Sequence, residues 1–228
     1  MISIIIPTFM EEKNIGLTIK SIKKEMKKIG KEYEIIVVDK YSKDKTTKIA
    51  KRLGARVLYD EFGKGSALIK GFKIAKGDIL VSMDADLSNR AEELPLLIDA
   101  VENGFDACFG SRFILGGKTE DISLLRKIGN KFFVMLVNLL YKTKYTDLCY
   151  GYRSFKKSAF KKLDLKEKGF GIETEMSIKA SKKGLKVIEI PSFEKKRLHG
   201  KSNLKTFKDG FVILRTIVSL LLKTKQSQ

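Results

Sequence analysis

Short apolar runs alternate with amphipathic segments through about the first 110 residues, and this alternation restricts the fold more than any other feature. The expected strands are residues 2–6, 35–38, 56–58, 79–83 and 107–110. The expected helices are residues 11–29, 44–53, 65–75 and 92–101. Strand–helix alternation with short connections predicts a mostly parallel sheet flanked by helices. Near-continuous apolar strands agree, because parallel strands are buried on both faces.

The second half of the chain is less regular. It predicts helices at residues 132–141 and 173–182 and strands at 150–155 and 185–190, then a polar loop at 197–202. We find no repeat or linker, so a single domain is expected at residues 1–210, followed by a C-terminal apolar and basic helix at 211–228. Its apolar run is shorter than the about 20 residues that span a bilayer. It is expected to lie on a membrane, or to pack on the core or on another subunit.

Basic residues are in excess, with 46 Lys and Arg against 27 Asp and Glu. Such a charge favours anionic partners: nucleic acid, a membrane surface or a phosphorylated substrate. The chain lacks zinc fingers and aromatic RNA-binding motifs, so nucleic acid is not expected. Cys108 and Cys149 show no disulfide or metal spacing and fit a reducing compartment. The first residues lack the basic leader of a signal peptide and are expected to form a strand.

Two carboxylates, Asp84 and Asp86, directly follow the expected strand at 79–83. The carboxyl edge of an open α/β sheet is where such folds bind ligands. Two hard oxygen donors suit Mg²⁺ or Mn²⁺, which bind a few carboxylates together with substrate phosphates. The triplet Asp84-Ala85-Asp86 is of a common type, and a polar turn after a strand is the alternative, so the interpretation depends on its neighbours.

Other polar residues follow neighbouring strands and are expected at the same edge. Thr8 and Glu11 follow the first strand, and Asp39 follows the second. A helix cap or turn is the alternative for each, and we favour it for Ser42 and Asp44. A carboxylate such as Asp39 can accept the N–H groups of a base, while a metal on paired carboxylates holds a diphosphate. The set predicts a nucleotide-diphosphate site.

The glycines around Lys64 precede an expected helix but match no phosphate-loop motif. Gly63-Lys64-Gly65-Ser66 lacks both the G-x-x-x-x-G-K-[ST] and the G-x-G-x-x-G spacing. A kinase, a GTPase or a dinucleotide-binding enzyme is therefore disfavoured, and the glycines can simply permit a turn.

Taken together, the motifs resemble inverting glycosyltransferases of family 2, and within them the dolichol-phosphate mannose synthases and other polyprenyl-phosphate sugar transferases. The resemblance extends to about Gly210. It is carried by Pro7-Thr8-Phe9-Met10-Glu11, Val37-Val38-Asp39, Gly63-Lys64-Gly65, Asp84-Ala85-Asp86, Gly110-Ser111-Arg112, Asp147-x-x-Tyr150-Gly151-Tyr152-Arg153, Glu173-Thr174-Glu175 and Arg197-x-x-Gly200-x-Ser202.

The resemblance implies an A-type glycosyltransferase fold in a catalytic domain at 1–210, with Mg²⁺ or Mn²⁺ held by Asp84 and Asp86. It implies a nucleotide-sugar donor, GDP-mannose or a UDP-hexose. The donor-binding residues that it implies are Pro7, Thr8, Phe9, Glu11, Asp39, Lys64, Asp84, Ala85 and Asp86.

The chain departs from the family pattern in three respects. Lys40 stands where the family usually has a second acid, near the nucleotide, and can meet phosphate charge instead. Ser88 and Asn89 stand where some relatives have the Gln or His of a third metal ligand. The chain has no Trp, although one is common in the family's acceptor loop.

Transfer of a sugar builds charge on the leaving diphosphate, and a metal on Asp86 stabilises that charge. Arg197 and Lys201, in the polar loop, are expected to add to it. A lipid phosphate acceptor is already a nucleophile and needs no general base. It needs a cationic receptor, for which Arg112 and Arg126 are the candidates. Arg126 can alternatively be an exposed helix start.

We expect a glycosyltransferase that moves a sugar, mannose as first choice, to a polyprenyl (dolichyl) phosphate at the cytoplasmic face of a membrane, through peripheral contact. One alternative is transfer to a saccharide hydroxyl, which needs a base, and Glu173 is the candidate. Glu173 can also orient the arginines. The alternative from another class is a catalytically silent basic module that binds lipid or nucleic acid, which Lys40 supports.

Overall fold

The central sheet is confirmed as mostly parallel. The computed structural model describes residues 1–200 and 202–225, with side chains through Leu222. Within these residues the main sheet has seven strands in the order β3-β2-β1-β4-β7-β5-β8, and only the pairs of β7 with β4 and β5 are antiparallel. The strands are β1 Ile2–Thr8, β2 Tyr33–Asp39, β3 Arg56–Tyr59, β4 Ile79–Ser82, β5 Ala107–Ser111, β7 Arg153–Lys156 and β8 Val187–Pro191. A small second sheet pairs β6 Lys118–Thr119 with β9 Phe193–Glu194.

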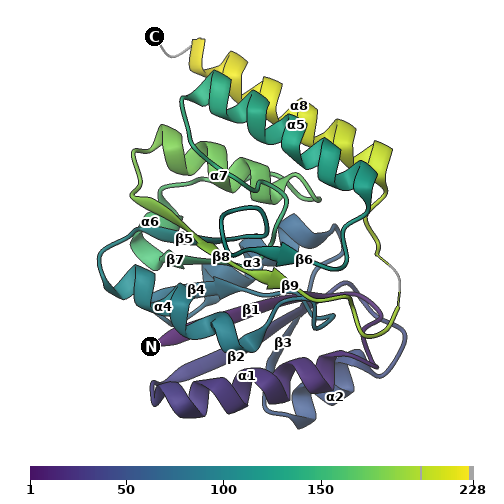
Figure 1. The fold of residues 1–228 in the computed structure, drawn as a ribbon. Coiled ribbons are helices and arrows are strands. Elements are labelled where there is room, and N and C mark those ends of the chain that lie inside the picture. The colour runs from purple at the N-terminus through teal and green to yellow at the C-terminus, as the bar shows by residue number, and fades with distance from the viewer. Residues whose placement is uncertain (201, 226–228) are drawn as a thin grey trace.

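Helices cover both faces of the sheet, as Figure 1 shows. They are α1 Ile15–Ile29, α2 Thr46–Arg52, α3 Lys64–Ile74, the 3-10 turn η1 Ala91–Glu93 with α4 Leu94–Glu102, α5 Leu124–Tyr141, α6 Lys157–Lys161, α7 Ile172–Lys182 and α8 Thr206–Lys225. Apolar residues of α1 and α4 form one core with one face of the sheet, and those of α3, α7 and α8 form another core with the opposite face.

Alternation along β1 explains how one strand serves both cores. Ile4 and Ile6 belong to the core under α1 and α4, whereas Ile5 belongs to the core under α3, and all three are fully buried. Helix α3 approaches the sheet closely at Gly71, where an added Cβ would lie 2.6 Å from Cγ2 of Ile5. Any larger residue at position 71 would therefore push α3 off the sheet.

Several expected boundaries were wrong. The strand expected at residues 150–155 begins only at Arg153. The helix expected from residue 132 begins at Leu124, where Ser123 caps it. The earlier start was missed because the first turns carry exposed apolar residues, such as Leu124 and Ile128, that show no buried face. Ser42 does not cap α2, since its hydroxyl donates to Asp39.

Helix α8 packs beside α5 and over α7 (Figure 1). Its inward residues Ile213, Ile217 and Leu220 are buried in the core, while Phe207 and Phe211 are 82% and 68% exposed. The helix begins at Thr206, so the division expected at residue 210 falls inside it. Among the described residues, no helix combines the length and apolar character that crossing a bilayer requires.

Candidate active site

The polar residues expected at one sheet edge do come together there. The parallel register places Thr8 beside Asp39, and β4 lies on the other side of β1. A cavity of about 960 Å³ opens at this edge. The cavity wall contains most residues that the sequence singled out: Pro7, Thr8, Phe9, Glu11, Lys64, Asp84, Ala85, Asp86, Arg112, Arg126, Glu173 and Arg197. Asp39 is not part of the wall, and Lys201 lies outside the described residues.

Lys64 joins two carboxylates on the cavity wall. From the start of α3, its Nζ lies 2.8 Å from Oδ1 of Asp84 and 2.9 Å from Oε1 of Glu173, in the first turn of α7. Burial alone would lower the pKa of Lys64, but the two carboxylates raise it above its ordinary value. Lys64 is therefore a permanent cation beside Asp84. Glu173 is engaged by this cation, and its role as a general base stays a prediction.

Asp86 is held by partners on both of its oxygens. Oδ1 accepts hydrogen bonds from the main-chain N–H of Ser88 at 3.1 Å and from its hydroxyl at 2.6 Å. Oδ2 lies 3.1 Å from Nη2 of Arg197. Ser88 therefore fixes the rotation of the carboxylate and leaves Oδ2 directed at the loop that carries Arg197.

The donor set fits a divalent cation that also binds substrate phosphates. Asp84 and Asp86 supply hard carboxylate oxygens on one wall of the cavity. Across residues 1–200 and 202–225, no group of three or more His, Cys, Asp or Glu forms a closed metal cage. Glu11 lies near both acids; burial raises its pKa, and Asp86 and Asp84 raise it further against the effect of Asn14. This crowding of acids favours a cation that a diphosphate helps to coordinate.

Asp39 joins neighbouring segments at the sheet edge and does not line the cavity. Its carboxylate is fully buried and accepts hydrogen bonds from the Thr8 hydroxyl at 2.8 Å and from the N–H and hydroxyl of Ser42, each at 2.7 Å. Contact of Asp39 with a nucleotide base stays a prediction. The neighbouring Lys40 does line the cavity and lies over the ring of Phe9, 6.0 Å from its centroid.

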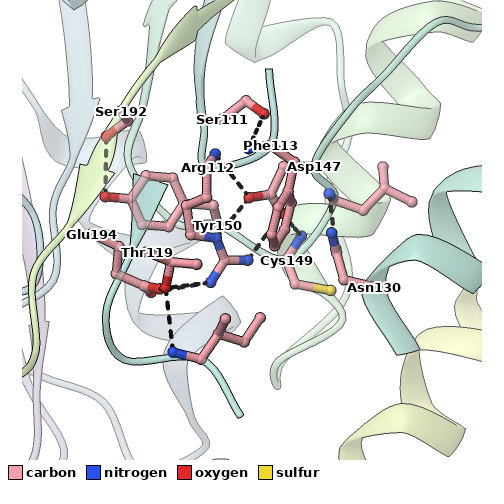
Figure 2. Close-up of polar contacts among 12 residues, drawn as sticks. Ser111, Arg112, Phe113, Thr119, Asn130, Asp147, Cys149, Tyr150, Ser192 and Glu194 are labelled. Atoms are coloured by element: carbon pink, nitrogen blue, oxygen red, sulfur yellow. Dashed lines mark hydrogen bonds and ion pairs between the residues drawn. The ribbon is translucent and has the colours of Figure 1, made fainter. Parts of the chain in front are cut away.

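Arg112 is the centre of a buried ionic network (Figure 2). Its Nε and Nη2 donate to the two oxygens of Asp147 at 2.7 and 3.0 Å, and its Nη1 donates to both oxygens of Glu194. The guanidinium also lies over the ring of Tyr150, 4.9 Å from its centroid. Burial would lower the pKa of Arg112, but Asp147 and Glu194 raise it. Two carboxylates thus compensate its charge.

Arg126 has a different environment, although the sequence treated it as equivalent to Arg112. It connects the start of α5 to the start of α8 and to the residues before it, donating to the hydroxyls of Thr206 and Ser202 and to the carbonyl of Leu204. No carboxylate in the described part of the chain lies within ion-pair distance of Arg126. Its positive charge therefore remains available to an anion in the cavity.

Sequence reasoning missed the partners of these arginines. Asp147 was part of a motif of the family resemblance, but no function was predicted for it, and no function was predicted for Glu194 or Asp121. Glu194 lies 82 positions from Arg112, and Asp121 lies 76 positions from Arg197. A carboxylate that follows the strand at 185–190 was the available signal for Glu194.

The mostly parallel α/β sheet, with paired carboxylates at its carboxyl edge, has the fold of A-type glycosyltransferases. Glucosyl-3-phosphoglycerate synthase from Mycobacterium tuberculosis, crystallised with Mn²⁺, UDP and glucosyl-3-phosphoglycerate, shares the fold with a TM-score of 0.75. The two chains are 21% identical, and the match covers 96% of this chain and 78% of that one.

The sequence comparisons give the family. The family model "Glycosyl transferase family 2" matches residues 3–164, and the chain belongs to that family. It is 37% identical to dolichol-phosphate mannosyltransferase from Pyrococcus furiosus, and the match covers 96% of this chain and 63% of that relative. It is 30% identical to undecaprenyl-phosphate mannosyltransferase from Micrococcus luteus, over 88% of this chain and 86% of that one. The chain thus spans less than two thirds of the Pyrococcus protein.

Proposed function

We propose that the protein is a metal-dependent inverting glycosyltransferase that moves a sugar, mannose as first choice, from a nucleotide diphosphate to a polyprenyl phosphate. The observation that carries the proposal is the cavity itself, which runs from Asp84 and Asp86 to an apolar wall on α5 and α8 that includes Phe132, Phe211 and Leu214. A polar donor end and an apolar end match a nucleotide sugar and a lipid. The names of the Pyrococcus and Micrococcus relatives support this choice.

In this mechanism Asp84 and Asp86 would hold Mg²⁺ or Mn²⁺, which when bound neutralises charge on the leaving diphosphate. Lys64 holds Asp84 in place and keeps Glu173 paired with a cation. A hydroxyl acceptor needs a free base, whereas a phosphate acceptor is already anionic. The pairing of Glu173 therefore favours the phosphate acceptor over transfer to a saccharide hydroxyl.

The donor can be identified by nucleotide binding. A nucleotide that binds only the native state raises the melting temperature according to its concentration and affinity. We expect GDP, or else UDP, to raise it in the presence of Mn²⁺ or Mg²⁺ and to have little effect with EDTA. Equal stabilisation with EDTA would argue against a metal-dependent donor site, and no stabilisation by any nucleotide would favour a catalytically silent module.

Arg126 is proposed as the receptor of the acceptor phosphate, because it faces the cavity without a carboxylate partner. Arg126→Ala is expected to raise the KM for polyprenyl phosphate about tenfold or more, the effect of losing one charge-assisted contact. The affinity for the nucleotide should stay unchanged. Arg52→Ala, an exposed arginine on α2 that does not line the cavity, is the matched control. An equal loss of nucleotide affinity would show that Arg126 does not serve the acceptor.

Peripheral membrane contact is proposed for the exposed apolar face of α5 and α8, which adjoins the apolar end of the cavity and gives the site access to a lipid at the cytoplasmic face. This face exposes Leu124, Ile128, Met135, Leu139, Phe207 and Phe211. The exposed cations Lys127, Lys131, Lys205 and Lys208 flank it. Each basic residue near an anionic surface adds about 1 kcal/mol of attraction, which salt screens, whereas inserted apolar side chains resist salt.

We expect binding to anionic vesicles that weakens but persists in high salt, and loss of the salt-resistant part in Phe207→Ser/Phe211→Ser. Vesicle sedimentation measures both. Leu17→Ser/Leu96→Ser, exposed on α1 and α4, is the control. These substitutions are sharper than truncation after Gly210, which would also remove the buried Ile213 and Ile217. Unchanged sedimentation of the Phe207/Phe211 variant at high salt would rule out this face.

A further inference from the structure

One nitrogen of Arg197 is shared between two carboxylates on the cavity wall. Nη2 lies 3.1 Å from Oδ2 of Asp86 and 3.4 Å from Oδ2 of Asp121. The other oxygen of Asp121 accepts the main-chain N–H of Arg197 at 3.4 Å. Asp121 is itself placed by Thr119 of β6, whose hydroxyl accepts its N–H. Arg197 therefore has a partner on the metal side and a second partner fixed to the small sheet.

The segment around Arg197 lies along the turn that carries Asp86. The N–H of Lys195 donates to the carbonyl of Ser88 at 2.9 Å, and the N–H of Leu198 donates to the carbonyl of Asp86 at 3.4 Å. On its other side, the carbonyl of His199 accepts from the side chain of Asn14 at 3.1 Å. These contacts keep the guanidinium against Oδ2, the Asp86 oxygen that Ser88 leaves free.

A divalent cation and this guanidinium compete for the same oxygen. Carboxylate oxygens approach Mg²⁺ to about 2.1 Å, so a guanidinium left on Oδ2 would place like charges within a few ångströms of each other. Asp121 offers the displaced side chain a partner that needs no movement of the main chain, because it already accepts the N–H of Arg197.

We propose that Arg197 is an internal counter-ion that a divalent cation must displace from Asp86, and that Asp121 is the positioning residue that retains Arg197 at the site after this exchange. The inference rests on the proposed function, because it takes Asp86 as a metal ligand. The exchange loosens one contact that holds residues 195–198 on the Asp86 turn, while Asp121 keeps a positive charge beside the leaving diphosphate. Cation binding is thereby coupled to the loop that carries Arg197.

The test is a titration with Mn²⁺ alone, in which electron paramagnetic resonance reports the free ion. Arg197→Gln removes the competitor and should bind Mn²⁺ about fivefold more tightly, a typical strength for a partly buried ion pair. Asp121→Asn leaves Arg197 to Asp86 alone and should bind Mn²⁺ about threefold more weakly. In Arg197→Gln/Asp121→Asn the effect of Asp121→Asn should vanish, because Asp121 acts through Arg197.

Arg52→Gln on α2 and Asp99→Asn on α4 make the same charge changes at exposed positions and should leave Mn²⁺ binding unchanged. Thermal melting controls for folding. If Arg197→Gln binds no more tightly than the wild type, or if Asp121→Asn keeps its effect in the double variant, the exchange is refuted while the glycosyltransferase proposal stands. If the wild type binds no Mn²⁺, with or without GDP or UDP, Asp86 is not a metal ligand and both proposals fall.

Discussion

Asp86→Ala is expected to abolish metal-dependent nucleotide binding and to reduce sugar transfer by about 10³-fold, while the protein remains folded. Asp86 lines the cavity, and its loss removes one of the two carboxylates proposed to hold the cation. The fold should tolerate the change because Arg197 keeps Asp121 as a partner. Calorimetry with GDP or UDP and Mn²⁺ measures the binding, and Asp99→Ala, an exposed acid on α4, is the control. Unchanged affinity in the Asp86 variant would remove the metal assignment.

Arg112→Ala is expected to destabilise the protein by about 3–5 kcal/mol, the cost of leaving buried carboxylates without their partner. Asp147 is fully buried, and the Arg112 side chain supplies its bidentate ion pair. Glu194 loses its ionic partner as well and keeps the hydroxyl of Thr119. Urea unfolding measures the loss as a lower midpoint with an unchanged slope. Arg126→Ala, whose partners are two hydroxyls and a carbonyl, should lose about 1 kcal/mol.

This pair of variants separates two arginines to which the sequence assigned the same role. Arg112→Lys keeps the charge but not the bidentate geometry, so its stability should fall between the wild type and Arg112→Ala. If Arg112→Ala is as stable as the wild type and has lost only its affinity for the acceptor, Arg112 is an acceptor residue after all. In that case the acceptor phosphate replaces Glu194 as the partner of Nη1 of Arg112.

The sheet edge was predictable because it depends on local signals. An apolar run such as residues 79–83 marks a strand, and the end of that strand fixes where the acids that follow it, Asp84 and Asp86, must lie. The small sheet was not predictable, because β6 and β9 have two residues each and show no period. The first turns of α5 were missed for a related reason: their apolar residues face outward, so no core pattern marks them.

The ionic partners inside the site were beyond local reasoning. Whether an arginine faces a carboxylate or an open cavity depends on which distant segments meet, as Glu194 and Asp147 do at Arg112. Asp39 shows the same limit on a smaller scale. Its place after β2 was predictable, but Ser42 and Thr8 take up its oxygens inside the edge.

Transfer to lipid tests the central claim most directly. The intact protein is incubated with radiolabelled GDP-mannose and a panel of labelled UDP-hexoses, with a polyprenyl phosphate and Mn²⁺ or Mg²⁺, and the label in the organic phase is counted. The account predicts that one labelled donor yields organic-soluble label that requires the metal and is lost in Asp86→Ala. Organic-soluble label that persists in EDTA or in Asp86→Ala, or its absence with every donor, would contradict the account.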